Sequence, residues 1–154
     1  MKLAVKQTVE EVFSVFLKDV SSYGGIGFYT VAILFFLMTD LDFAMRLAIS
    51  LITITIAVAA VRLTYFKPRP GMKKRSYLTY YERIDNSSFP SIHAARAILI
   101  SLALYTLAPA ITPLFLFLTA MVCASRIFFR RHDYVDITTG LVLGAVLGYV
   151  FFIA

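Results

Sequence analysis

The sequence predicts an all-α integral membrane protein, a bundle of about five transmembrane helices preceded by an amphipathic helix. Hydrophobic residues make up 60% of the 154 positions and the mean hydropathy is +0.80, whereas a soluble globular domain is about 45–50% apolar. The apolar residues lie in runs that approach the ~20 residues a membrane-spanning helix needs. The charged residues concentrate between these runs. We therefore expect a single membrane-embedded domain over residues 1–154.

Residues 1–22 are predicted to form an amphipathic helix at the membrane surface. Valine, leucine and phenylalanine recur there at helical spacing, with Lys6, Glu10 and Lys18 among them. We do not expect a cleaved signal peptide, because charged residues interrupt the apolar run and no small-residue cleavage site follows. Serine and glycine at residues 21–25 end the helix.

Five apolar runs follow and are predicted to cross the membrane: 25–38, 43–66, 91–107, 114–129 and 137–154. Asp40 and Asp42 end the first run, and Pro109 and Pro113 mark an uncharged turn between the third and the fourth.

Residues 67–90 are the only long polar stretch and are predicted to form a loop at the site. Because successive spans run in opposite directions, this loop and the junction between the last two spans must lie at the same membrane face. Cationic and reactive side chains spread over 75 positions of sequence therefore meet there: Arg62, Arg69, Ser91, His93, Arg126, His132 and Asp136.

The net charge of +6 comes from 15 lysine and arginine residues against 9 acidic ones, and most of the excess lies in loops. Such an excess indicates anionic lipid headgroups or an anionic substrate. Nucleic acid is not expected as a partner, because no soluble basic domain remains once the spans are removed. Cys123 is the only cysteine, so neither an internal disulfide nor a cysteine-based metal site is expected.

The first candidate site element is RLTYFKPRP at residues 62–70. Proline stops the helix, so Arg69 is expected to fold back toward Arg62 from an extended segment. Guanidinium groups suit phosphate oxygens because they present paired donors. Lys67 lies between them as a further candidate. Alone, a basic end of a span is more often an interfacial anchor.

The second element is FPSIHAARA at residues 89–97. Pro90 is expected in the first turn of a helix capped by Ser87 or Ser88, whose first free amides would face an anion. His93 lies in that turn and can donate a proton near neutral pH. By itself, a histidine at a helix start is more often a capped interfacial residue.

The third element is SRIFFRRHDYVD at residues 125–136. If the last helix begins near Arg131, His132 and Asp136 lie four residues apart on one face. The carboxylate would then hold one imidazole nitrogen and leave the other as a nucleophile. Polar clusters beside lipid are costly and usually functional, although a purely structural His–Asp contact explains this element alone equally well.

Together the three elements resemble the signature motifs of the type 2 phosphatidic acid phosphatase superfamily of membrane lipid phosphatases. Those motifs are Lys, six residues, Arg-Pro; Pro-Ser-Gly-His; and Ser-Arg, five residues, His, three residues, Asp. The third matches at every fixed position, whereas Arg62 replaces the lysine of the first and Ile92 the glycine of the second. The resemblance covers about residues 60–140, and the family core commonly has six spans.

The resemblance implies that His132 is the nucleophile and forms a phosphohistidine, that Asp136 orients it, and that His93 protonates the leaving group. It implies that four residues hold the nonbridging phosphate oxygens: Arg62, Arg69, Ser91 and Arg126. No metal or other cofactor is expected, because the sequence contains no carboxylate cluster suited to Mg²⁺.

The implied function is metal-independent hydrolysis of a lipid phosphate or diphosphate in the bilayer. A polyprenyl diphosphate of the undecaprenyl or dolichyl kind is favoured, because no soluble lid or extra domain is present to select a larger headgroup. Phosphatidate or phosphatidylglycerophosphate phosphatase, lipid phosphotransferase and noncatalytic headgroup-binding protein are the alternatives. The sequence does not indicate the oligomeric state.

The predicted location is a cell membrane. The resemblance implies a site at the extracytoplasmic face. The distribution of positive charge points the other way, because the site face holds 14 of the 15 lysine and arginine residues, but cations that bind substrate contribute to that count.

Overall fold

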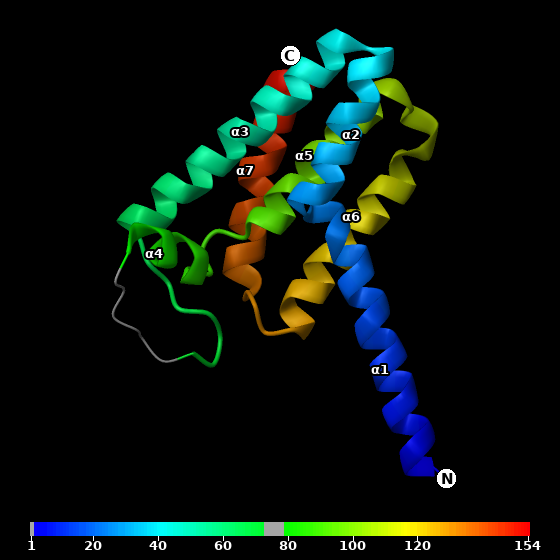
Figure 1. Ribbon diagram of the computed structural model, residues 1–154, viewed down its shortest axis with the longest axis vertical. Coiled ribbons are helices and arrows are strands. Elements are labelled where there is room, and N and C mark those ends of the chain that lie inside the picture. Colours follow the sequence, from blue (N-terminus) through cyan, green and yellow to red (C-terminus); the bar gives the residue numbers. More distant parts are fainter. Residues whose placement is uncertain (1, 73–78) are drawn as a thin grey trace.

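The computed structural model describes residues 2–72 and 79–154, and the side chains from residue 10 onward within them. The described chain is helical and contains no named strand (Figure 1). Its elements are α1 (Lys2–Ser21), the 3-10 helix η1 (Ser22–Gly24), α2 (Ile26–Thr39), α3 (Leu41–Thr64), α4 (Tyr80–Asn86), α5 (Ile92–Leu107), the 3-10 helix η2 (Pro109–Ile111), α6 (Thr112–Phe128) and α7 (Tyr134–Phe152).

The predicted all-α membrane bundle is confirmed, with fewer full-length spans than expected. Among the described residues, α3, η2 with α6, and α7 are each long and apolar enough to cross a membrane. The end of α1 with η1 and α2 would make a fourth span, bent by 50° between Gly24 and Ile26. The run predicted at 91–107 forms α5, whose 16 residues extend only about 24 Å at ~1.5 Å per residue, less than the ~30 Å hydrocarbon core.

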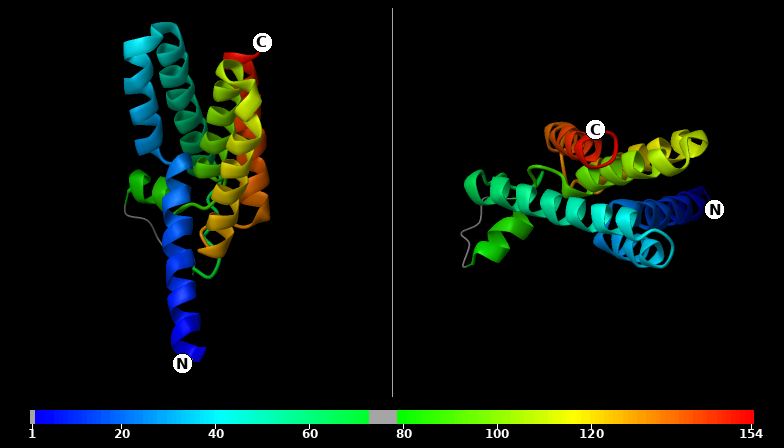
Figure 2. Two further views of the ribbon diagram at one scale, coloured as in Figure 1. Left: turned by 90° about the vertical axis from the view of Figure 1, so that its right-hand side faces the viewer. Right: turned by 90° about the horizontal axis from the view of Figure 1, so that it is seen from above.

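Helix α5 is the centre of the bundle and packs against α3, α6 and α7 (Figures 1 and 2). Eight of its residues are buried, four of them alanine. A helix enclosed by other helices need not match the thickness of the bilayer, which explains how a short helix is accommodated here.

A glycine seam, formed by Gly140, Gly144 and Gly148 of α7, lets this helix lie against the backbone of α5. A Cβ atom on Gly140 would press on the Ser91 carbonyl, and one on Gly144 would press on the Ala95 carbonyl. Small residues four apart allow such close approach of membrane helices. The seam therefore brings the first turns of α5 and α7 together, although these turns are more than 40 residues apart in sequence.

The predicted N-terminal helix is present as α1, and it extends beyond the rest of the bundle (Figure 2). Its second half packs on α6. Leu17 is buried there, and the Phe13 and Phe128 rings meet edge to face at 5.7 Å between centroids. That α1 lies at the membrane surface stays a prediction.

The segment predicted as a loop at 67–90 contains a helix that the sequence analysis missed. Helix α4 begins after Thr79, whose hydroxyl accepts the Glu82 amide at 3.2 Å, and its seven residues are too few for an apolar periodicity. Residues 73–78 of this loop lie outside the described residues. Ser88 ties the end of the loop to its start, because its amide donates to the Lys67 carbonyl at 2.8 Å.

Two helix starts differ from expectation. Ser91, not Ser87 or Ser88, caps α5 and accepts the Ala94 amide at 3.5 Å. Helix α7 begins at Tyr134 rather than near Arg131, because Asp133 is its N-cap and forms a capping box with Asp136. A helix cannot start before its cap, so His132 lies outside α7.

The glycine seam generates a stability prediction. Gly144→Ala should destabilise the protein by about 1–3 kcal/mol, because the added methyl group meets backbone that cannot move aside as a side chain can. Thermal unfolding in detergent would measure the loss. Gly27→Ala is the matched control, because nothing lies within 4 Å of a Cβ at Gly27 in α2. Equal melting temperatures for the two variants would contradict close packing at the seam.

Candidate active site

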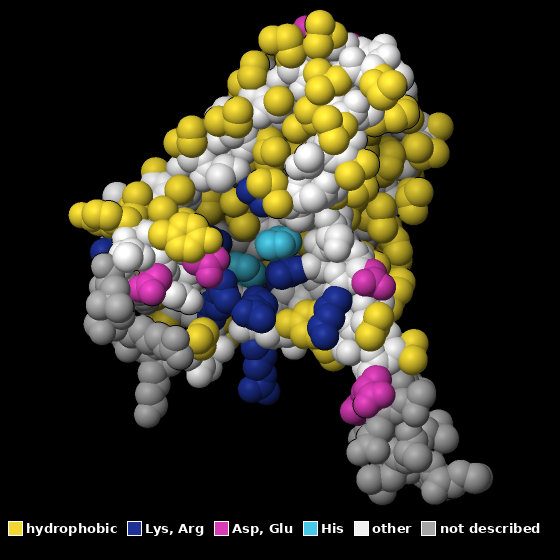
Figure 3. All heavy atoms as spheres, in the orientation of Figure 1, with side chains coloured by type: hydrophobic (Ala, Val, Ile, Leu, Met, Phe, Trp, Pro, Cys, Tyr) yellow, Lys and Arg dark blue, Asp and Glu magenta, His cyan; other side chains and the backbone are white. Residues whose placement is uncertain are grey.

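A pocket of about 190 Å³ opens at the end of the bundle where α3 and α6 end and α5 begins. Figure 3 shows both histidines there, surrounded by lysine and arginine and lying below the mainly hydrophobic upper part of this face. The residues that line the pocket come from helices α3, α4, α5 and α6 and from the segments that follow α3 and α6: Arg62, Arg69, Asp85, Ile92, His93, Arg126, Arg131 and His132. The predicted convergence of the three sequence elements is therefore present in the structure for these residues.

Two of the lining arginines, Arg62 and Arg69, are oriented by backbone carbonyl groups. The two terminal nitrogens of Arg62 donate to the Ile84 and Pro90 carbonyls, both at 2.9 Å. Arg69 donates to the Asp85 carbonyl at 2.7 Å from an extended segment, as predicted. Five buried arginine Nε groups have no hydrogen-bond partner among the described residues, and three of them belong to pocket arginines: Arg62, Arg69 and Arg126. Buried donors are normally satisfied, so these three groups fit an anion in the pocket.

The electrostatic balance of the pocket also favours an anion. Four arginines line it and Asp85 is the one acidic residue among the lining residues described. Burial, and then the charge of Arg131, lower the pKa of Arg69. A phosphate placed among these groups would relieve the repulsion between the guanidinium groups, because its charge is opposite to theirs.

His93 lies at the N-terminal end of α5, where the helix dipole is positive. It lines the pocket together with Ile92, which occupies the motif position of the glycine. Gly24 of η1 packs directly on the backbone of His93, and a Cβ there would come within 2.5 Å of the His93 carbonyl oxygen. The position of His93 is therefore set from two sides, by its own helix and by η1.

His132 is held by a backbone carbonyl rather than by the predicted carboxylate. Its Nδ1 lies 2.7 Å from the Ser88 carbonyl oxygen, which only accepts, so Nδ1 carries the proton. The nearest oxygen of Asp136 is 3.7 Å from Nδ1, beyond hydrogen-bond distance. The expected imidazole–carboxylate hydrogen bond is therefore absent from this pair, because His132 precedes the helix. Nε2 is left with its lone pair, as a nucleophile requires.

Asp136 is fully buried and is bound by other groups. It accepts the Lys67 ammonium at 2.8 Å and the Asp133 amide at 3.0 Å. Lys67 also pairs with the Asp133 carboxylate. Partial burial alone would lower the pKa of Lys67, but the hydrogen bonds to both carboxylates outweigh it and the pKa is raised above 10.5. Lys67, considered above as a phosphate ligand, instead neutralises the carboxylates behind His132.

Sequence comparison places the chain in a family. The model of the PAP2 superfamily matches residues 43–154, more than half of the chain. The chain belongs to the PAP2 superfamily. This membership supports a lipid phosphatase in a membrane. No curated protein matches the chain significantly.

A crystal structure of LpxE from Aquifex aeolicus matches the fold with a TM-score of 0.73. The two sequences are 18% identical, and the match covers 91% of this chain and 85% of that one. At this identity the likeness shows that the PAP2 member described here shares the helical arrangement of LpxE.

Most of the predicted site residues of this PAP2 protein line the pocket, whereas Asp136 and Ser91 do not. Arg62, Arg69, His93, Arg126 and His132 line one pocket, as does Ile92. Asp136 lies behind His132. Ser91 does not line the pocket, since its hydroxyl caps α5 and its amide donates to the Asp136 carbonyl at 2.9 Å.

Sequence reasoning missed three contributors to the site: Asp85, Ser88 and Arg131. Ser88 acts through its carbonyl group, which every residue possesses, so no side-chain pattern could reveal it. Arg131 lies directly before His132 within the third motif and could have been found there. A turn bonds its amide to the Arg126 carbonyl at 2.9 Å and so places its side chain at the pocket.

The Lys67 pair predicts a change in stability. Lys67→Met should lower the free energy of unfolding by roughly 3 kcal/mol at neutral pH, because the Asp136 carboxylate is then buried without its cation. In the double variant with Asp136→Asn, a large part of the loss should be recovered. Since the pKa of Lys67 is raised, the pair contributes fully below pH 10.5 and its contribution falls as the pH rises through the folded-state pKa. Thermal unfolding in detergent against pH would measure this, and a single variant as stable as the wild type would contradict it.

Proposed function

We propose that this PAP2 protein is a metal-independent lipid phosphatase that works through a phosphohistidine on His132. The observation that carries the proposal is the meeting of two histidines with three buried, unpartnered guanidinium Nε groups in one pocket. Such a pocket offers a nucleophile, an acid and an anion clamp together.

The reaction begins with the phosphate oxygens bound to Arg62, Arg69 and Arg126. Nε2 of His132 attacks phosphorus, and the bond from phosphorus to the lipid oxygen breaks with its electron pair on oxygen. His93 supplies a proton to that oxygen. Water then attacks the phosphorus of the phosphohistidine and gives up its proton to His93. The bond from phosphorus to Nε2 breaks with its electron pair on nitrogen, which releases inorganic phosphate and restores His132. The guanidinium groups neutralise the charge of the transferring group, the task that a metal ion performs elsewhere.

The groups behind His132 fit this course. The Ser88 carbonyl holds the Nδ1 proton, so that Nε2 is the free nitrogen. When Nε2 bonds to phosphorus, the ring becomes positive, and the Asp136 carboxylate at 3.7 Å stabilises that charge through space. Asp136 thus acts by electrostatics, and Ser88 takes over the orienting part first assigned to it.

A polyprenyl diphosphate is the proposed substrate. The pocket lies at the end of the apolar helices, so the tail of a lipid can stay in the bilayer while its phosphate reaches His132. Phosphatidate and phosphatidylglycerophosphate carry the same reactive group and are the alternative substrates. Transfer of the phosphoryl group from His132 to an acceptor other than water is the alternative reaction.

Replacement of the nucleophile tests the proposal. His132→Ala should lower phosphate release from a polyprenyl diphosphate by at least ~1,000-fold, because no other group takes over covalent catalysis. EDTA should leave wild-type turnover unchanged. The assay should also use polyprenyl monophosphate, phosphatidate and phosphatidylglycerophosphate, whose relative kcat/KM values decide the substrate class.

Arg130→Gln is the control for this assay, because Arg130 is exposed on the same face and lines neither this pocket nor its neighbour. Substantial phosphate release by His132→Ala, with Arg130→Gln fully active, would refute the phosphohistidine. Strict dependence of phosphate loss on an added alcohol acceptor would favour the phosphotransferase.

The extracytoplasmic position of the site can be tested with two cysteines in a Cys123→Ala background. Tyr80 is 80% exposed at the start of α4 near the site, and Met38 is 89% exposed at the far end of α2. A membrane-impermeant thiol reagent added to intact cells should label Tyr80→Cys and spare Met38→Cys. The reverse pattern would place the site in the cytoplasm.

A further inference from the structure

A second cationic pocket of about 230 Å³ adjoins the first, between the end of α1 and the end of α6. Its lining residues are Lys18, Ser21, Arg126, Phe129 and Arg131. Three of these five are cations and none is acidic. The three motifs do not account for this pocket, because Lys18 and Ser21 lie more than 40 residues before the first motif.

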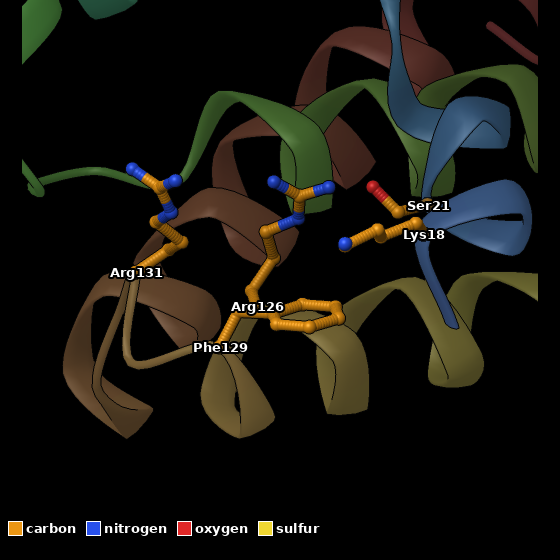
Figure 4. Close-up of a pocket in the computed structure, with 5 residues that line it drawn as sticks. All are labelled: Lys18, Ser21, Arg126, Phe129 and Arg131. Atoms are coloured by element: carbon orange, nitrogen blue, oxygen red, sulfur yellow. The ribbon is translucent and has the colours of Figure 1, made fainter. Parts of the chain in front are cut away.

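Packing of α1 on α6 holds Lys18 of α1 beside Arg126 of α6. Lys18 extends over the Phe129 ring with its Nζ 5.9 Å from the ring centroid. Leu17, the preceding residue, is 2% exposed and anchors this turn of α1. Figure 4 shows Arg126 between Arg131 and Lys18, with the Lys18 ammonium and the Ser21 hydroxyl directed toward its guanidinium.

The two pockets share a wall, because Arg126 and Arg131 line both. An anion on each side of this wall would contact the same two guanidinium groups. Two phosphates joined by one bridging oxygen meet this requirement, since their phosphorus atoms are only a few ångströms apart. Two separate anions would have to be brought together against their repulsion.

We infer that the pocket of Lys18, Ser21 and Arg131 is a second phosphate subsite, which holds the lipid-linked phosphate of a diphosphate while the terminal phosphate lies beside His132. This inference rests on the proposed function and narrows its substrate to lipid diphosphates.

The subsite has a defined part in the reaction. Nε2 of His132 bonds to the terminal phosphorus, and the bond from that phosphorus to the bridging oxygen breaks. The electron pair stays on the bridging oxygen, so the lipid monophosphate leaves with one more negative charge unless His93 protonates it. Lys18 and Arg126 face the leaving phosphate and stabilise this charge. A lipid monophosphate, whose leaving group is an alcohol, gains nothing from Lys18.

Lys18→Gln tests the subsite by comparing two substrates with the same tail. Its kcat/KM for a polyprenyl diphosphate should fall about 10–100-fold, as expected for loss of one charged hydrogen bond to phosphate. Its kcat/KM for the polyprenyl monophosphate should change less than about twofold. Lys18→Arg should keep most of the diphosphate activity, and Arg130→Gln, which removes a charge outside both pockets, should match the wild type on both substrates. Equal losses on the two substrates, or no loss on either, would overturn the inference.

A binding measurement separates this inference from the proposed function. Inorganic pyrophosphate should raise the melting temperature of the detergent-solubilised wild type more than orthophosphate does, and Lys18→Gln should abolish that difference. If no lipid phosphate is hydrolysed and the Lys18-dependent preference for pyrophosphate persists, the phosphatase proposal fails and the subsite stands. Equal stabilisation of the wild type by the two anions would overturn the subsite.

Discussion

The close approach of α5 and α7 is the constraint on which the rest of the structure depends. Gly140 and Gly144 present no side chain to α5, so the backbones meet at the Ser91 and Ala95 carbonyls. At that distance the Ser91 amide donates to the Asp136 carbonyl across the two helices. The starts of the helices that carry His93 and follow His132 are therefore aligned by backbone contact. Side chains at these glycine positions would separate the histidines.

The arginines around the pocket show how a cation cluster can be maintained beside a bilayer. The terminal nitrogens of Arg62 and Arg69 donate to carbonyl groups within residues 84–90, whereas the Nε groups of both residues have no hydrogen-bond partner among the described residues. These bonds orient the guanidinium planes and also hold α4 and the segment after it against α3 and the chain that follows it. The cations are thus in place before any anion binds, and little reorganisation is needed when charge develops in a transition state.

A chain of contacts from the polar segment to α7 supports the proposed nucleophile. Lys67 bridges the carboxylates of Asp133 and Asp136 at the start of α7. Ser88 joins Lys67 through its amide and His132 through its carbonyl. The residues that surround the His132 ring therefore belong to both ends of the polar segment after α3 as well as to its own motif. On the other side of the pocket, α1 adds Lys18 to the arginine near the end of α6, so the cationic surface continues into the second pocket.

The sequence alone determined the helical membrane fold, the face at which the polar elements meet and most of the pocket residues. Apolar runs near the length of a bilayer leave few alternatives, and alternating spans place Arg62, His93 and His132 at one end whatever the packing. Only the tertiary structure decided which contacts each group makes. Spacing of four suggested that Asp136 holds His132, but the Asp133 cap begins the helix one residue too late, and a carbonyl of Ser88 holds the ring instead. Backbone partners, the Lys67 bridge and the Lys18 pocket all join segments distant in sequence. Residue type and local spacing carry no record of such contacts, because helix packing brings these segments together.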